Sequence, residues 1–473
     1  MKNLQKPTIS TCMIVKNEEH LLTNCLNSIK SVVDEIIIVD TGSTDDTIKI
    51  AKSFGAKVFL HPWNDSFSEA RNHSLNYASG DWILQIDADE ELEQADIPIL
   101  KSAINCNGYN GIIVSIQSVI KDNLHTFYTT RIFRRNKGFY KDIIHEQLIV
   151  KGNRLSTEIR LYHHGYNLDK EKMEVKWQRT TYLLKKQIEQ NKFDSFAWFN
   201  LVRNYRTQDL FQDGINAGMQ ALAIISPNLC SKHTETNVNL HHYAMISYET
   251  ANCYLHNEDF TNAKELCHTA LSKLTQLEIT PDNIDIIFTL ACIYLKEGCY
   301  GKAIDYFNKF LYLRKSYLDD MNANSLMIDT LGYDYAAYNG MGYCFGNLGQ
   351  WEQALLHLQK AILCNPRYLN AYKNLTSCYT NLCRYTEAIN TLLRTVSEGI
   401  ADDAVLLKLG ELYIQQEAFE KAIPYLEEYL KIHPDDGGAV IKLAQSYEKL
   451  GHLEAALIGY ISVMGKRVLC PET

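Results

Sequence analysis

Proline is scarce in this sequence, with 9 among 473 residues, whereas average usage of about 5% would give more than twice that number. Because proline breaks helix interiors, the low count favours a chain rich in helix. No run of about 18 consecutive apolar residues occurs, and the first seven residues lack the apolar core of a signal peptide. We therefore expect no transmembrane helix and a cytoplasmic location.

An excess of basic residues is also absent, since 47 Lys and Arg face 56 Asp and Glu, for a net charge of −9. Nucleic-acid binding needs a basic surface, so we expect no nucleic-acid partner. The 13 cysteines are odd in number and include no CxxC pair, which argues against a disulfide framework and for buried small apolar residues. The apolar fraction of 46% is that of an ordinary globular protein.

The first 165 residues alternate short apolar runs with amphipathic stretches. The strand candidates are 9–15, 35–39, 57–60 and 82–86, and the helix candidates are 19–33, 44–54 and 66–78. This alternation predicts an α/β layer fold with a parallel sheet. Such sheets bind ligands at the carboxyl ends of their strands, which is where Asp40 and Asp87 fall.

After about residue 190 the strand pattern gives way to a repeat of 34 residues. Small residues recur at this interval, with an aromatic residue nine positions before each of them. The pairs are Phe345 and Ala354, Tyr379 and Ala388, Tyr413 and Ala422, and Tyr447 and Ala456, with less regular pairs upstream at Tyr294 and Ala303, Tyr254 and Ala263, and Tyr205 and Gly214. The period resembles that of the tetratricopeptide repeat and predicts an all-α solenoid, interrupted by an insertion at 314–332.

Four segments of the first half resemble the family 2 glycosyltransferases, which have the GT-A fold (a Rossmann-like α/β fold). They are Met13–Glu19, Ile38–Thr47, Ala70–Asn72 and Ile86–Glu90. Their order and spacing on successive strand ends make the likeness specific, and it covers about residues 8–165. One departure is Lys16, where the family usually has Tyr or His.

The resemblance implies a UDP-sugar donor and a divalent cation. A nucleotide-sugar diphosphate leaves with growing negative charge, which a cation held by acidic side chains offsets. Asp87 and Asp89 lie two positions apart, so on a strand both would point to one face. Their oxygen ligands suit Mn²⁺ or Mg²⁺. By resemblance, Asp89 is the metal ligand proper, while Asp87 reaches the ribose or shares the metal.

The resemblance also assigns a donor pocket. Asp40 would accept hydrogen bonds from uracil or ribose, with a helix-cap or turn role as the alternative, and Gly42 would allow the chain to turn beneath the base. Arg71 would be a cation near the diphosphate or base, with a plain surface salt bridge as the alternative. The remaining residues assigned to this pocket are Ile14, Lys16 and Glu18.

An inverting transferase needs a group that takes the proton of the acceptor. Within the segment 139–147 the candidates are Glu146, which we favour, Asp142 and His145. Further on, His163 and His164 precede Gly-Tyr, and either would complete the metal site or contact the diphosphate, with His163 slightly favoured by resemblance.

A small basic cluster stands out in this acidic chain at Arg131, Arg134 and Arg135. It would face a phosphate or the acceptor, or else belong to a solvated loop.

The whole layout is similar to the bacterial peptide glycosyltransferases of the SunS type. We expect a GT-A domain at 1–166, a helical linker at 167–190 and a solenoid of about six to seven helix pairs at 191–473. The predicted activity is transfer of a hexose to a Cys, Ser or Thr side chain of a peptide or protein held by the repeats. The alternatives are transfer to a lipid-linked or cell-envelope saccharide, with the repeats used for assembly, and a scaffold with a degenerate transferase domain, against which the acidic motif residues argue. A homodimer is possible.

Overall fold

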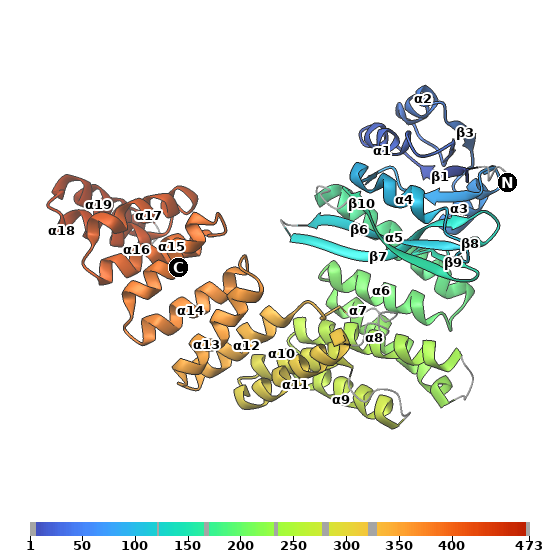
Figure 1. Ribbon diagram of the computed structural model, residues 1–473. Coiled ribbons are helices and arrows are strands. Elements are labelled where there is room, and N and C mark those ends of the chain that lie inside the picture. Colours follow the sequence, from blue (N-terminus) through green and yellow to red (C-terminus); the bar gives the residue numbers. More distant parts are fainter. Residues whose placement is uncertain are drawn as a thin grey trace. The chain divides into compact units, whose positions relative to one another are not determined.

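The computed structural model describes residues 6–120, 123–164, 170–230, 235–276, 283–319 and 329–469 (Figure 1). The chain forms two compact units, Met1–Ala217 and Gly218–Thr473. The expected boundaries at residues 166 and 190 both fall inside the first unit, and residue 166 lies outside the described part of the chain. The first unit therefore contains the segment that we expected to be a linker as well as the α/β domain.

Among the described residues, the first unit is built on an eight-stranded sheet with the strand order β3-β2-β1-β4-β7-β6-β10-β5, and a second sheet pairs β8 with β9. The strands are β1 (Ile9–Val15), β2 (Glu35–Asp40), β3 (Lys57–Leu60), β4 (Trp82–Gln85), β5 (Glu90–Leu92), β6 (Gly111–Ile120), β7 (Asn123–Arg134), β8 (Gly138–Lys141), β9 (Gln147–Val150) and β10 (Arg154–His163). The helices are α1 (Leu22–Ile29), α2 (Thr47–Ser53), α3 (Phe67–Leu75), a 3-10 turn (Gln94–Asp96), α4 (Ile97–Ala103), α5 (Lys170–Gln190) and α6 (Ser195–Thr207).

The predicted parallel sheet is present in strands β3, β2, β1 and β4. Apolar side chains on both faces of these strands are buried, as expected where helices cover both sides. On one face Met13 packs in a core that contains Leu26 of α1. On the other face Cys12 and Ile37 pack in a second cluster with Leu75 of α3.

The other half of the sheet corrects the expectation of a wholly parallel arrangement. Strand β7 is antiparallel to both β4 and β6, and β5 is antiparallel to β10. Only residues 121 and 122 separate β6 from β7. So short a connection permits antiparallel pairing alone, because parallel neighbours need a crossover of a dozen or more residues.

Helix α2 begins at Thr47, three residues later than expected. The preceding residues are instead bonded to the loop after β1: the Asn17 backbone N–H donates to Ser43 Oγ at 2.9 Å, and the Thr44 N–H donates to Asn17 Oδ1 at 2.8 Å. Asn17 adopts a left-handed backbone conformation with φ of 58°. The two loops thus fix each other, and with them the position of Glu18.

Helices make up the second unit and pack in consecutive hairpins, from α8 and α9 to α18 and α19, which confirms the predicted solenoid (Figure 1). After α7 (Phe211–Ile225), which spans the unit boundary, and a 3-10 turn (Ser226–Cys230), the helices are α8 (Glu235–His256), α9 (Phe260–Gln276), α10 (Ile284–Lys296), α11 (Tyr300–Asp319), α12 (Asp334–Asn347), α13 (Trp351–Cys364), α14 (Leu369–Asn381), α15 (Tyr385–Ser397), α16 (Asp403–Gln415), α17 (Phe419–Ile432), α18 (Gly437–Lys449) and α19 (Leu453–Leu469). Residues 320–328 of the expected insertion lie outside the described residues. None of the described helices is both long and apolar enough to cross a membrane.

Small residues let the paired helices of this array approach closely. Ala354 and Ala422 are fully buried, as the repeat register requires. A second set of small residues lies twelve positions earlier, at Gly342 and Gly410. A Cβ atom on Gly342 would lie 2.5 Å from Leu358 Cγ, and one on Gly410 would lie 2.7 Å from a Leu426 side-chain carbon. Glycine is therefore needed there for space rather than for backbone freedom.

Candidate active site

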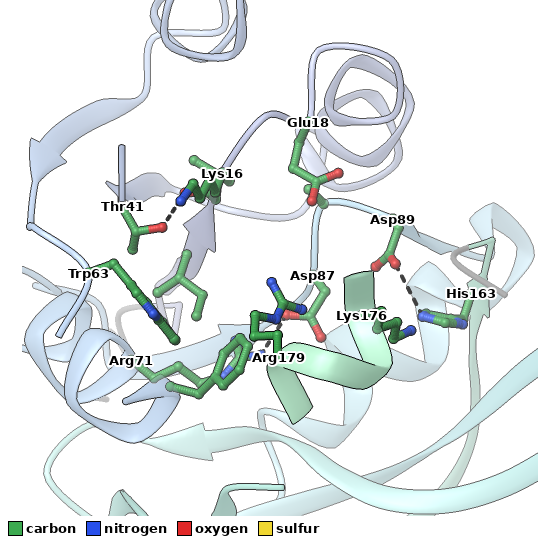
Figure 2. Close-up of a pocket in the computed structure, with 14 residues that line it drawn as sticks. Lys16, Glu18, Thr41, Trp63, Arg71, Asp87, Asp89, His163, Lys176 and Arg179 are labelled. Carbon is green, nitrogen blue, oxygen red and sulfur yellow. Dashed lines mark hydrogen bonds and ion pairs between the residues drawn. The ribbon is translucent and has the colours of Figure 1, made fainter. Parts of the chain in front are cut away.

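A cavity of about 340 Å³ opens at the carboxyl-terminal edge of β1, β2 and β4 (Figure 2). This is the edge at which open α/β sheets bind their ligands. Charged side chains of both signs line the cavity, and most of them follow the ends of these strands or belong to α3 and α5. The full lining is Ile14, Val15, Lys16, Glu18, Thr41, Trp63, Phe67, Arg71, Asp87, Ala88, Asp89, His163, Lys176 and Arg179.

Most of the residues predicted to bind the donor line this cavity, namely Ile14, Lys16, Glu18, Arg71 and Asp87. Asp40 does not belong to the lining, although its neighbour Thr41 does. The Asp40 side chain is buried, and its Oδ1 accepts hydrogen bonds from the backbone N–H groups of Gly42 and Ser43, each at 3.0 Å. Gly42 has a φ of 113°, a conformation that favours glycine. Asp40 therefore shapes the turn beneath the cavity.

Glu18 carries the clearest electrostatic signature in the cavity. Burial raises its pKa to about 7, and the negative charges of Asp89, Asp87 and Asp45 act in the same direction. Like charges that crowd together disfavour ionisation. Several carboxylates thus lie close together on this side of the cavity. A cation bound between them would be stabilised by their negative charge.

Arg71 of α3 connects two acidic segments that are distant in the sequence. Its Nε donates to Glu146 Oε1 at 2.6 Å, and its Nη2 donates to Asp87 Oδ1 at 2.8 Å. The side chain is 8% exposed, so this is a buried ion pair and the expected alternative of a surface salt bridge is wrong. The third nitrogen, Nη1, is buried and has no hydrogen-bond partner among the described residues.

Asp87 is held in its ionised form by two arginines. Burial alone would raise its pKa, but the charges of Arg71 and Arg131 hold the pKa of this carboxyl well below its usual range. Arg131 of β7 also donates to Glu90 Oε1 at 2.6 Å and to Gln85 Oε1. Its guanidinium is thus neither solvated nor free to meet a phosphate, because it serves as counterion to the acidic turn.

Of the two remaining arginines in the small basic cluster, one contacts other parts of the protein and one is exposed. Arg134 Nε donates to the Tyr109 carbonyl at 3.1 Å, and its guanidinium lies 4.5 Å from the Trp82 ring centre. Arg135, in contrast, is exposed. The sequence pattern of three nearby arginines therefore does not correspond to one shared site.

The acidic pair Asp87 and Asp89 does not belong to a strand. Strand β4 ends at Gln85, residues 86 and 87 are irregular and 88 and 89 form a turn, so the alternation of strand side chains is not what brings both carboxylates to the cavity. Asp89 Oδ2 lies 3.2 Å from His163 Nε2 at the end of β10 (Figure 2). His164 points elsewhere, with its Nε2 3.3 Å from Glu91 Oε1, and does not line the cavity.

The three candidate bases follow β8 in one irregular segment, and none of them belongs to the cavity lining. Glu146 lies behind Arg71, to which it is bonded. Asp142 and His145 both have left-handed backbone conformations, with φ of 75° and 52°. The segment is tied to α3 by the Phe67 N–H, which donates to the Ile143 carbonyl at 2.8 Å.

Trp63 and Phe67 of the cavity lie outside every motif that the sequence singled out, and so do two cations of α5, Lys176 and Arg179 (Figure 2). They lie three residues apart on the helix face that also carries the buried Leu183. The spacing was visible in the sequence, since residues at i, i+3 and i+7 share one helix face. What the pattern did not indicate is that this face borders the cavity.

The described residues contain no group of three His, Cys, Asp or Glu side chains able to hold a metal ion. Asp89 and His163 approach each other as two ligands would, whereas both Asp87 oxygens are engaged by arginines. Mg²⁺ and similar cations are commonly bound by one or two carboxylates together with substrate phosphates and waters. The Asp89 and His163 pair fits such a site, and Asp87 fits it poorly.

Comparisons with known proteins find a different family in each half of the chain. Residues 10–165 match the family described as "Glycosyl transferase family 2", and residues 284–317 and 413–458 match tetratricopeptide repeats. The predicted resemblances of the two halves are confirmed.

Among similar proteins, the SPbeta prophage-derived glycosyltransferase SunS of Bacillus subtilis is 30% identical over 191 residues, which are 38% of this chain and 45% of that protein. An uncharacterised glycosyltransferase of Rickettsia typhi is 48% identical over 86 residues, 18% of this chain and 29% of that protein. A TPR repeat-containing protein of Synechococcus elongatus is 55% identical over 84 residues, 18% of this chain and 21% of that protein. The chain thus spans less than half the length of each of these relatives.

Proposed function

Since the chain joins a family 2 glycosyltransferase domain to tetratricopeptide repeats, we propose that it transfers a hexose from a UDP-sugar to a side chain of a peptide or protein. The acceptor would be a Cys, Ser or Thr residue held by the repeats, and the transfer would proceed with inversion. The observation that carries this proposal is the cavity at the strand ends, lined by Lys16, Arg71, Asp87 and Asp89.

The cavity suits a nucleotide diphosphate because it offers cationic groups, one of them the buried Arg71, beside an acidic edge. The Nη1 of Arg71 is a buried donor without a partner among the described residues, and such a donor gains most from an anionic ligand. Asp87 keeps Arg71 charged and in place through the 2.8 Å ion pair. We assign Asp87 to this positioning role and to contact with the ribose.

Asp89 and His163 would hold Mn²⁺ or Mg²⁺. Burial, together with the negative charges of Asp89 and Asp87, raises the pKa of Glu18 to about 7, and a cation bound here would offset the part that comes from those charges. A bound cation supplies charge neutralisation for the departing diphosphate. His164 is left out of this assignment because it pairs with Glu91 outside the cavity.

Glu146 remains our proposed base, with Asp142 and His145 as the alternatives in the same segment. Arg71 occupies Oε1 of Glu146, and the described contacts leave Oε2 without a hydrogen bond.

The decisive experiment measures UDP release from a set of UDP-hexoses by the full chain, with intact-mass detection of modified peptides. We expect release in Mn²⁺ or Mg²⁺ and its loss in EDTA. Asp89→Ala should lower kcat/KM at least about 100-fold, because a bound cation is worth several kcal/mol of charge stabilisation.

Glu91→Ala is the matched control, since Glu91 lies two residues from Asp89 but outside the cavity. It should change kcat/KM by less than about twofold, the effect expected of a surface carboxylate. Full activity in EDTA, or an unimpaired Asp89→Ala, would contradict the metal assignment. Transfer to a saccharide but to no peptide would contradict the acceptor assignment and favour a lipid-linked or cell-envelope substrate.

A further inference from the structure

Helix α5 is fixed on the catalytic unit by its C-terminal half. Asp65, in the loop between β3 and α3, accepts from Lys186 Nζ at 2.8 Å and from the Tyr182 hydroxyl at 3.1 Å. Two residues one turn apart on α5 thus donate hydrogen bonds to the same carboxylate. The contact ties the helix to the loop that carries Trp63, one wall of the cavity.

A second anchor joins α5 to the segment of the candidate bases. The buried Gln187 accepts through Oε1 from the Ile143 N–H at 2.9 Å and donates through Nε2 to Asp194 Oδ2 at 2.8 Å. Because Gln187 lies next to Lys186 in the sequence, the two anchors hold α5 against two separate parts of the α/β domain. The helix therefore has a defined place over the cavity.

The anchored helix presents two cations to the cavity (Figure 2). The Arg179 guanidinium lies 5.6 Å from the Phe67 ring centre, and Phe67 in turn meets Trp63 edge to face at 4.8 Å. Arg179 forms no ion pair with any side chain of the described residues, in contrast to Arg71, which is already neutralised by two carboxylates. Arg179 thus brings to the cavity a positive charge that no carboxylate in the described part of the chain offsets through an ion pair.

We propose that α5 is part of the donor site, and that Arg179 and Lys176 bind the diphosphate of the nucleotide sugar. This proposal rests on the proposed glycosyl transfer. In that reaction the acceptor atom forms a bond to C1 of the sugar, and the bond from C1 to the β-phosphate oxygen breaks. The electron pair stays on the departing nucleoside diphosphate, and the acceptor proton passes to the base. The two cations hold the negative charge that the diphosphate gains.

The test compares binding of UDP and of uridine to the full chain by calorimetry. Arg179→Ala should weaken UDP binding about tenfold or more, which is what the loss of one charge-assisted contact costs. Uridine, which lacks phosphate, should bind the variant as it binds the unaltered chain. Arg179→Lys should recover part of the loss, since it keeps the charge but not the planar fork.

The matched control is Lys185→Ala, an exposed cation of the same helix outside the cavity, which should leave UDP binding unchanged. Circular dichroism of each variant checks that the overall helix content is unchanged. If the unaltered chain binds UDP and Arg179→Ala binds it equally well, the role of α5 is overturned while the proposed function stands. If the unaltered chain does not bind UDP, the proposed function itself is overturned, and this inference with it.

Discussion

Arg71 is the side chain through which the acidic turn after β4 and the segment of the candidate bases meet. Its partners Asp87 and Glu146 are 16 and 75 residues away in the sequence. Buried ion pairs add little net stability when complete, but removing one partner leaves an uncompensated charge. Arg71 thus makes the two segments depend on each other.

Arg71→Ala should lower the free energy of unfolding of the first unit by about 3 kcal/mol, because Asp87 and Glu146 would both lose a buried partner. Hydrogen exchange of the β4 amides measures this change in the full chain. Arg71→Lys should be milder, since it keeps the charge. The exposed Arg135→Ala serves as control and should leave exchange unchanged. Unaltered hydrogen exchange of the β4 amides in Arg71→Ala would show that the ion pairs do not stabilise the first unit.

The sequence predicted the identity of the cavity residues better than their contacts. Glu18, Arg71, Asp87 and Asp89 were recognised because each sits in a motif, and all line the cavity. Their partners were not predictable, since pairing across 75 residues depends on how β8 folds back beside α3. For Asp40 the sequence left a ligand contact and a turn role open, because a side chain that caps its own loop and one that meets a ligand look alike in sequence.

At the scale of elements, strands were predicted more accurately than their pairing. Strands β1, β2, β3 and β4 lie within one residue of the expected ranges, because each contains a short apolar run. The antiparallel half and the packing of α5 were not predicted. Both depend on the length of connections and on tertiary contacts, neither of which changes the periodicity of a segment.

Two glycines one turn apart on α12 give a matched test of helix packing. A Cβ on Gly342 would lie 2.5 Å from Leu358 Cγ, whereas one on Gly346 would find no atom nearer than 3.6 Å. Gly342→Ala should therefore destabilise the array by about 1–3 kcal/mol through overpacking. Gly346→Ala should stabilise it by about 0.5–1 kcal/mol, because alanine favours helix over glycine. Hydrogen exchange of α12 and α13 amides measures both changes, and equal effects would contradict the close approach of this pair.

At the scale of the whole molecule, every residue of the cavity lies between Ile14 and Arg179, and the anchors of α5 extend only to Asp194. All of these residues belong to the first compact unit, Met1–Ala217. The proposed donor chemistry thus has no need of α8 to α19. The repeats are available for another task, and solenoids offer extended surfaces suited to binding chains.

A chain that ends at residue 230 should separate these tasks. We expect it to bind UDP within about twofold of the full chain, because no cavity residue is removed. A twofold difference is the size of effect expected of changes far from a binding site. Transfer to a peptide acceptor should show a KM at least about tenfold higher, since the second binding module that raises the local acceptor concentration is gone. UDP calorimetry and intact-mass kinetics on one preparation measure both quantities, and calorimetry also reports whether the shortened chain is folded. An unchanged peptide KM beside normal UDP binding would show that the acceptor is recognised by the first unit alone.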